Sequence, residues 1–181
     1  MSETKHIMQE LQIEKVTLNC GCGVDHALLD KSVKLLESIT NKTAVRTKSK
    51  VRLASWGLRK GLPIGAKVTI RGQDAHALVK RLVEAKEFQL KPTSFDSRGN
   101  VSFGISECID IPGVEYTPDI GIIGLQVTIT FTKPGTRVKN RKYRPSHIPA
   151  RHLVQRDEAI EYMAKNFGVS LIQKEDEEDE E

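Results

Sequence analysis

The sequence lacks the features by which membrane and secreted proteins are commonly recognised. Its longest apolar runs are only a few residues, whereas a helix that spans a bilayer needs about 20, so we expect no membrane association. The first 12 residues carry charges and no continuous apolar stretch, which argues against a secretory signal. Only three cysteines are present, Cys20, Cys22 and Cys108. This sparse, odd count is typical of a protein of the reducing cytoplasm.

Acidic residues are missing from two long stretches of the chain. Residues 38–73 contain no Asp or Glu but hold Lys42, Arg46, Lys48, Lys50, Arg52, Arg59, Lys60, Lys67 and Arg71. Residues 133–156 are also free of acids and include Arg137, Lys139, Arg141, Lys142, Arg144 and Arg151. An ordinary solvated surface intersperses charges of both signs. Two separate basic blocks therefore favour a protein that contacts a polyanion.

The net charge of +4 conceals this basic character, because residues 175–181 are all acidic. The 24 acidic residues include these seven, so the rest of the chain has 28 basic against 17 acidic residues, a net charge of +11. We expect one domain over residues 1–173, with a basic extension at about 133–152. Residues 174–181 are expected to form a disordered acidic tail.

Hydrophobic periodicity predicts strands at 13–20, 44–53, 66–71, 101–105 and 125–132, and helices at 26–40, 74–86 and 155–167. Asp25 and Asp74 are the expected caps of the first two helices. In the first strand, Val16, Leu18 and Cys20 should face opposite to Ile13, Lys15, Thr17 and Asn19. In the second, Val45, Thr47, Ser49, Val51 and Leu53 should face opposite to Arg46, Lys48, Lys50 and Arg52.

The fold class that this order predicts is α+β. The strands keep a polar or basic outer face, whereas a parallel sheet covered on both sides would show near-continuous apolar runs. We therefore expect an antiparallel or mixed sheet with helices on one face and the other face open. Such a face supplies cations for phosphates and neutral groups for sugars and bases. The expected RNA-binding residues on it are Arg46, Lys48, Lys50, Arg52, Lys67, Thr69 and Arg71.

A glycine-rich and proline-containing loop is predicted from Trp56 to Gly65. It combines the cations Arg59 and Lys60 with Gly61, Leu62 and Pro63, and it is longer than a plain hairpin requires. Long loops are either functional or merely mobile. We interpret this one as a finger that contacts RNA, with a mobile surface loop as the alternative.

Two constellations resemble sites for small ligands but are incomplete. Gly21-x-Gly23 follows a strand and precedes a helix, as in a dinucleotide fingerprint, but the third glycine would fall at His26 and no acidic residue stands about 20 residues onward. The glycines alternatively make a tight turn or allow RNA to approach the backbone. Cys20, Cys22 and His26 lack the second ligand pair of a structural zinc site. We expect no metal, no cofactor and no catalytic residue.

Several segments resemble the L-five family of large-subunit ribosomal proteins, in the order and with the spacing typical of that family. They are Val16-Thr-Leu-Asn-Cys-Gly-Cys-Gly23, Thr47-Lys-Ser-Lys50, Leu58-Arg-Lys-Gly-Leu-Pro-Ile-Gly-Ala-Lys-Val-Thr-Ile-Arg-Gly72, Ser94-Phe-Asp-Ser-Arg-Gly-Asn-Val-Ser-Phe-Gly104 and Gly124-Leu-Gln-Val-Thr-Ile-Thr130. The resemblance covers residues from about 12 to 132. The short segment before the first strand and the basic stretch after Lys133 are similar to the archaeal and eukaryotic branch.

The resemblance implies a structural protein of the cytoplasmic ribosome with an open-sided α+β fold. Its implied partners are 5S ribosomal RNA, a stem of the large-subunit ribosomal RNA, peptidyl-site transfer RNA and neighbouring proteins of the central protuberance. Asn19, Gly21, Gly23, Thr47 and Lys48 then belong to the surface that faces 5S RNA, and residues 59–65 to the loop that reaches transfer RNA. Two alternatives stay open. They are a nucleotide-dependent enzyme that uses the Gly21–Gly23 turn and an adaptor whose acidic tail binds protein partners.

Overall fold

The centre of the structure is a five-stranded sheet in which every neighbouring pair of strands is antiparallel. The structure, a computed structural model, describes residues 6–172. The main sheet has the order β2-β3-β1-β6-β5, with β1 Gln12–Gly21, β2 Val45–Lys48, β3 Pro63–Ile70, β5 Val101–Ile105 and β6 Leu125–Thr132. The helices are α1 His26–Thr40, α2 Gln73–Glu84, α3 Arg137–Asn140 and α4 Arg156–Phe167. The predicted α+β class is confirmed.

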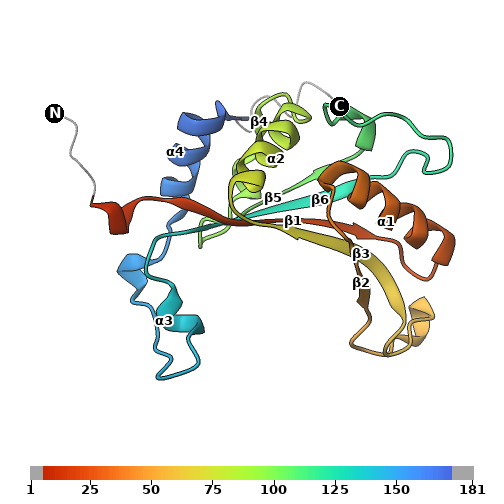
Figure 1. The fold of residues 1–181 in the computed structure, drawn as a ribbon, viewed down its shortest axis with the longest axis horizontal. Coiled ribbons are helices and arrows are strands. Elements are labelled where there is room, and N and C mark those ends of the chain that lie inside the picture. Colours follow the sequence, from red (N-terminus) through yellow and green to blue (C-terminus); the bar gives the residue numbers. More distant parts are fainter. Residues whose placement is uncertain (1–5, 173–181) are drawn as a thin grey trace.

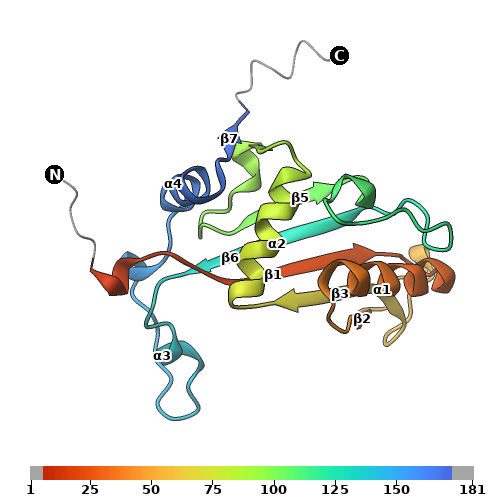
Figure 2. The ribbon, with the colours of Figure 1, turned by 45° about the horizontal axis from the view of Figure 1, so that its top comes forward.

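The helices α1, α2 and α4 lie on one side of the sheet, as Figures 1 and 2 show. α1 packs on β3 and α2 on β1. α4 lies beside α2, where the Phe167 ring stacks on His76 with their centroids 6.2 Å apart. It also packs on β6, where the Tyr162 ring meets Phe131 edge to face with their centroids 5.3 Å apart. The expected one-sided arrangement of helices is therefore present. It follows from strands that carry apolar residues on one face only.

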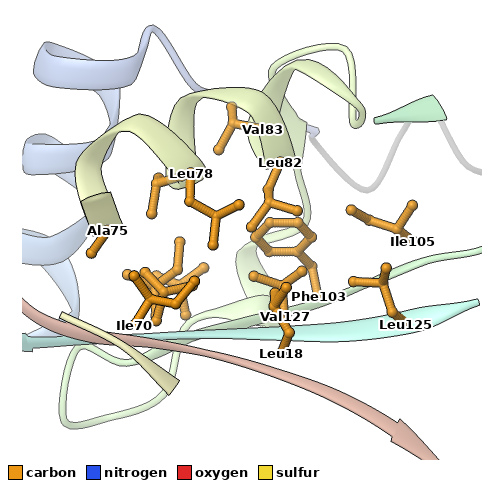
Figure 3. Close-up of a cluster of buried hydrophobic side chains, with 14 of the residues drawn as sticks. Leu18, Ile70, Ala75, Leu78, Leu82, Val83, Phe103, Ile105, Leu125 and Val127 are labelled. Carbon is orange, nitrogen blue, oxygen red and sulfur yellow. The ribbon is translucent and has the colours of Figure 1, made fainter. Parts of the chain in front are cut away.

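The core lies between this helical layer and the sheet. Figure 3 shows Leu78, Leu82 and Val83 of α2 above Leu18 and Val127 of the central strands. All five of these side chains are at most 4% exposed. The spacing of residues 78, 82 and 83 is that of one helix face, and residues 16, 18 and 20 alternate as one strand face. The buried face of the helix and the buried face of the strand together make one continuous apolar layer.

The first helix forms as its sequence predicts. Asp25 is the N-cap of α1, and its carboxylate accepts hydrogen bonds from the backbone N–H groups of Ala27 and Leu28. The second predicted cap is wrong, because α2 begins after Gly72 and Asp74 lies within its first turn. The Asp74 carboxylate instead pairs with Lys42 Nζ at 2.7 Å. The salt bridge thus links the segment after α1 to the start of α2.

The prediction for Ile13 is also wrong, because that side chain is buried on the same side as Val16. The register between β1 and β6 shifts between Ile13 and Lys15. A bulge inserts one residue and so reverses the alternation on one side of it. Ile13 therefore joins the core although it is an odd number of residues from Val16.

The second predicted strand is shorter than expected. β2 ends at Lys48 and forms one edge of the sheet, and residues 49–53 belong to a long hairpin loop. The supposed core residues Val45 and Val51 are 60% and 61% exposed. The cause for Val45 is the register, which aligns it with Lys67 on the uncovered side of β3. Alternation in the sequence identifies two faces but cannot say which face is buried.

A second sheet was not predicted at all. β4 Gln89–Leu90 pairs in parallel with β7 Ser170–Leu171. Strands of two residues are too short to show a period, so the region 88–100 reads as a loop. The pairing attaches the end of the described chain to the turn after α2. The predicted tail at 174–181, and the domain boundary before it, lie outside the described residues.

Replacement of Leu18 by Ala tests the core. Leu18 is fully buried in the central strand, so Leu18→Ala should lower the free energy of unfolding by about 2–5 kcal/mol, as measured by denaturant titration. The control Lys34→Ala, on the exposed side of α1, should change it by less than about 0.5 kcal/mol. Equal effects of the two substitutions would contradict the described core.

Candidate nucleic-acid interface

The side of the sheet that carries no helix presents a polar surface, which we call the open face. The register of the strands places residues of all five main strands on it. They are Lys15, Thr17, Asn19, Gly21, Val45, Thr47, Lys67, Thr69, Ser102, Gly104, Gln126, Thr128 and Thr130. All of them are exposed or partly exposed, and none is acidic. The open face therefore combines two lysines with many neutral hydrogen-bonding groups.

Some of these neutral groups contact one another across the strands. Asn19 Nδ2 donates to Gln126 Oε1 at 3.4 Å, and Ser102 Oγ donates to Thr128 Oγ1 at 3.2 Å. Each amide or hydroxyl keeps further donor or acceptor capacity beyond these single bonds. The surface can therefore offer hydrogen bonds to the sugars, phosphates or base edges of a nucleic acid.

A hairpin loop, residues 49–62, connects the edge strand β2 to β3. Its base is closed by Ser49 N–H donating to the Leu62 carbonyl at 2.8 Å, and Leu53 and Leu58 form an isolated bridge further out. The short helix η2, Ala54–Trp56, lies between these bridge partners. Trp56 is 70% exposed. The loop is thus an internally hydrogen-bonded finger with an apolar ring at its surface.

The second basic block forms a closed arm, residues 133–152, which we call the basic arm. At its base Lys133 Nζ pairs with Glu158 of α4 at 2.7 Å, and His152 Nε2 donates to the Pro134 carbonyl at 2.8 Å. Ser146 N–H donates to the Val138 carbonyl and closes the arm further out. The exposed Arg and Lys residues of the arm are Arg137, Lys139, Arg141, Lys142, Arg144 and Arg151.

The hairpin loop and the basic arm both project from the sheet on the side away from α1 and α2, at opposite ends of the open face (Figure 1). The two acid-free blocks of the sequence, more than 80 residues apart at their starts, are therefore brought to one side of the molecule. The open face lies between them. This arrangement makes one surface of positive sign from three separate parts of the chain.

Five of the predicted binding residues lie on the open face: Asn19, Gly21, Thr47, Lys67 and Thr69. The side chains that sequence reasoning missed are Lys15, Thr17, Ser102, Gln126, Thr128 and Thr130. The same alternation that identified β1 and β6 contained this information. The register between strands then shows that these residues lie beside Asn19 and Lys67.

Arg46 does not lie on the open face, so its predicted position is wrong. Its register partner is Ala66, which is buried beneath the helices, and its guanidinium pairs with Asp30 of α1 at 2.7 Å. Arg71 lies one residue beyond β3 and pairs with Glu14 at 3.3 Å. Both cations are thus partly neutralised by the chain itself.

The remaining predicted residues border the open face. Lys48 is the exposed last residue of β2, and Lys50 and Arg52 belong to the hairpin loop rather than to a strand. Arg59, Lys60 and Gly61 are exposed in the same loop, Leu62 is half-buried, and Pro63 begins β3. Gly23 has a φ of +63° in the turn after β1, a conformation that glycine adopts without strain.

This turn does not have the geometry of a dinucleotide site. Such a site needs a parallel sheet and a helix N-terminus open to a pyrophosphate. β1 is antiparallel to both neighbours, and the Asp25 carboxylate already occupies the N-terminus of α1. The negative charge of Asp25 repels a phosphate from that position.

The cysteines near the turn are structural. Burial raises the pKa of the Cys20 thiol to about 12, with smaller contributions from Cys22 and Cys108, so it stays protonated and does not favour a metal or a nucleophilic role. Cys22 Sγ lies 3.2 Å from Ser32 Oγ in the core. Within residues 6–172, no three His, Cys, Asp or Glu side chains gather as a metal site, and no helix has the length and apolarity to cross a bilayer.

The fold and this surface define a class: open-sided α+β proteins with a basic, hydroxyl-rich face. Comparisons with known proteins are more specific. Residues 6–59 match the family described as ribosomal protein L5, and residues 63–162 match the C-terminus of the same ribosomal family. The chain belongs to the ribosomal protein L5 family. The predicted family, its location on the ribosome and its non-enzymatic, structural character are thereby confirmed.

Relatives from archaea match nearly the whole chain. A protein of Methanosphaera stadtmanae is 45% identical over 92% of this chain and 99% of its own length. A protein of Sulfurisphaera tokodaii is 43% identical over 96% of this chain and 99% of its own. Both are named large ribosomal subunit protein uL5. The expected similarity to the archaeal branch is consistent with these matches.

Acid titration tests the loop of the Ser94–Gly104 motif. Hydrogen bonds from the Asn100 side chain, then from the Ser97 backbone and hydroxyl, hold the pKa of Asp96 below its ordinary value of 3.8. A lowered folded-state pKa stabilises the fold above the ordinary value, and this stabilisation fades as the pH falls below it. Asp96→Asn should therefore be less stable than the wild type at about pH 6, and the difference should shrink at about pH 3. Denaturant titrations at both pH values measure it. A difference that stays constant would contradict the assigned hydrogen bonds.

Proposed function

We propose that the open face binds 5S ribosomal RNA, and that the base of the hairpin loop, with Lys50 and Arg52, and the basic arm extend this contact on either side. The observation that carries the proposal is the convergence of two acid-free basic segments on the uncovered side of one sheet (Figure 1). Polar strands alone do not distinguish an RNA surface from a solvated one. Cations that lie on the same side of the sheet, at both ends of the open face, favour a polyanion as the partner.

The chemistry of the open face suits folded RNA. Lys67 of β3 lies between Asn19 of β1 and Val45 of β2, and its side chain makes no ion pair among the described residues. It is therefore available to a phosphate. Thr17, Thr69 and Asn19 surround it with neutral groups that can reach 2′-hydroxyls and the edges of bases. RNA helices are recognised mainly through shape, phosphates and 2′-hydroxyls, and this face presents the matching groups.

Family resemblance supports the finer assignments. In this proposal the chain lies in the central protuberance of the large subunit, where it also contacts the large-subunit ribosomal RNA and neighbouring ribosomal proteins. Gly23, Lys48, Lys50 and Arg52 border the 5S RNA contact. The hairpin loop reaches peptidyl-site transfer RNA through Trp56, Arg59 and Lys60. An exposed indole beside guanidinium and ammonium groups suits contact with unpaired bases and phosphates.

Salt dependence tests the open face. Each phosphate neutralised by the protein adds about 0.9 to the slope of log affinity against log salt concentration for a duplex. Lys67→Gln should therefore lower the slope for 5S RNA by about 0.9 and weaken binding, as measured by filter binding or fluorescence anisotropy across a salt series. Its fold should be unchanged by circular dichroism, since Lys67 is exposed.

The matched control is Lys34→Gln, which removes the same charge from the exposed side of α1. Because α1 lies on the opposite side of the sheet, this variant should keep the wild-type slope. A wild-type affinity that does not change with salt would refute the proposal. Equal slopes for the two variants would show that Lys67 contacts no phosphate, and that the open face is not the RNA surface.

The hairpin loop can be tested separately from the sheet. Trp56→Ala combined with Arg59→Gln should leave affinity for 5S RNA within about twofold of the wild type, because these residues project beyond the open face. The same change should weaken transfer RNA binding to reconstituted large subunits by about tenfold, the size of effect expected when base stacking contributes about 1–3 kcal/mol. Unchanged transfer RNA binding would show that the hairpin loop does not contact transfer RNA.

A further inference from the structure

A hollow of about 430 Å³ lies where the open face meets the basic arm. Lys15 of β1 and Thr130 of β6 lie on its sheet side, Arg98 and Asn100 on its second side, and Lys139 on the arm side. Its volume is within the range of small-ligand sites, so it can accept a whole nucleotide rather than only an ion. Arg98 and Asn100 belong neither to the open face nor to the basic arm, so the hollow brings a third part of the chain to that surface.

The loop that carries Arg98 is held in place by its own hydrogen bonds. Asp96 N–H donates to the Asn100 carbonyl at 2.8 Å, and the Asp96 carboxylate accepts from the side chain of Asn100 at 3.3 Å. Gly99, at a φ of +73°, packs so closely that a Cβ there would lie 2.5 Å from Val154 Cγ1. The motif thus fixes this loop against the end of the basic arm and holds Arg98 at the hollow.

The charges around the hollow are unbalanced. The side chains of Lys15, Arg98 and Lys139 make no ion pair or hydrogen bond with other residues of the described chain. The Arg98 guanidinium is attracted only to the Asp96 carboxylate, whose pKa it helps to lower. The one acidic side chain of the lining, Glu14, already pairs with Arg71 at 3.3 Å. The ammonium groups of Lys15 and Lys139 therefore have no counter-charge among the described residues, and the Arg98 guanidinium has only the attraction of Asp96.

We propose that this hollow binds the phosphate of a nucleotide in an RNA strand that runs from the open face onto the basic arm. The inference rests on the proposed function and adds a defined phosphate site to it. Arg98 supplies a planar guanidinium, which binds phosphate oxygens in pairs. Lys15 and Lys139 approach from the two other sides, and Thr130 and Asn100 offer neutral hydrogen bonds to the ribose. The site connects the RNA contacts of the open face with those of the basic arm, so that one RNA strand can follow both.

The test uses two double variants of the full chain that remove equal charge. Arg98→Gln with Lys139→Gln should lower the salt slope for 5S RNA by about 0.7–0.9 per lost contact. Lys34→Gln with Lys80→Gln, on exposed positions of α1 and α2, should leave it at the wild-type value. Thermal unfolding of both variants checks the fold, which should hold because all four residues are exposed.

The outcomes separate this inference from the proposed function. If the wild type shows no salt-dependent RNA binding, the proposed function itself fails. If the wild type binds and the two double variants have equal slopes, only the hollow is excluded as a phosphate site. Inorganic phosphate serves as a second probe. If it stabilises the wild type but not Arg98→Gln with Lys139→Gln, while the RNA slopes stay equal, the site binds free phosphate and the RNA path is overturned.

Discussion

The pairing of β1 with both β3 and β6 is the constraint on which the rest of the structure depends. Residues 16–19 of this central strand are held in register on both sides, and its two ends on one side each. Val16, Leu18 and Cys20 therefore form one buried row, and Thr17 and Asn19 form one partly exposed row. A shift by one residue would exchange the two rows. The core and the open face are thus two consequences of the same register.

The same sheet also organises the basic segments. The hairpin loop leaves from the edge strand β2, whereas the basic arm leaves from the end of β6 next to the centre of the sheet. Their anchors are specific: Ser49 closes the loop and Lys133 ties the arm to α4. Both segments can therefore extend the open face without covering it. The helices meanwhile occupy the other side, where Arg46 is held by Asp30.

Much of the fold could be predicted because its elements have clear periods. α1 has the predicted bounds, with Asp25 as its cap, and β6 alternates along its whole length. The buried face of β2 could not be predicted, since the alternation of Val45 and Arg46 is the same whichever of the two is buried. The pairing of β4 with β7 joins residues about 80 positions apart, and nothing within either pair of residues indicates its partner. Of the predicted binding residues, Lys67 and Asn19 lie together, whereas Arg46 lies on the other side.

The sequence alone determined that the strands carry apolar residues on one face only, that two basic segments lack acidic residues, and that the chain has the motifs of its family. These properties are local, because a period of two, a run of cations or a glycine turn needs only neighbouring positions. Only the folded molecule decided which side of the sheet is open, which cations the chain neutralises, and that Arg98 meets Lys15 and Lys139 around one hollow. Strand register and long-range packing set those relations, and neither is encoded within a single segment.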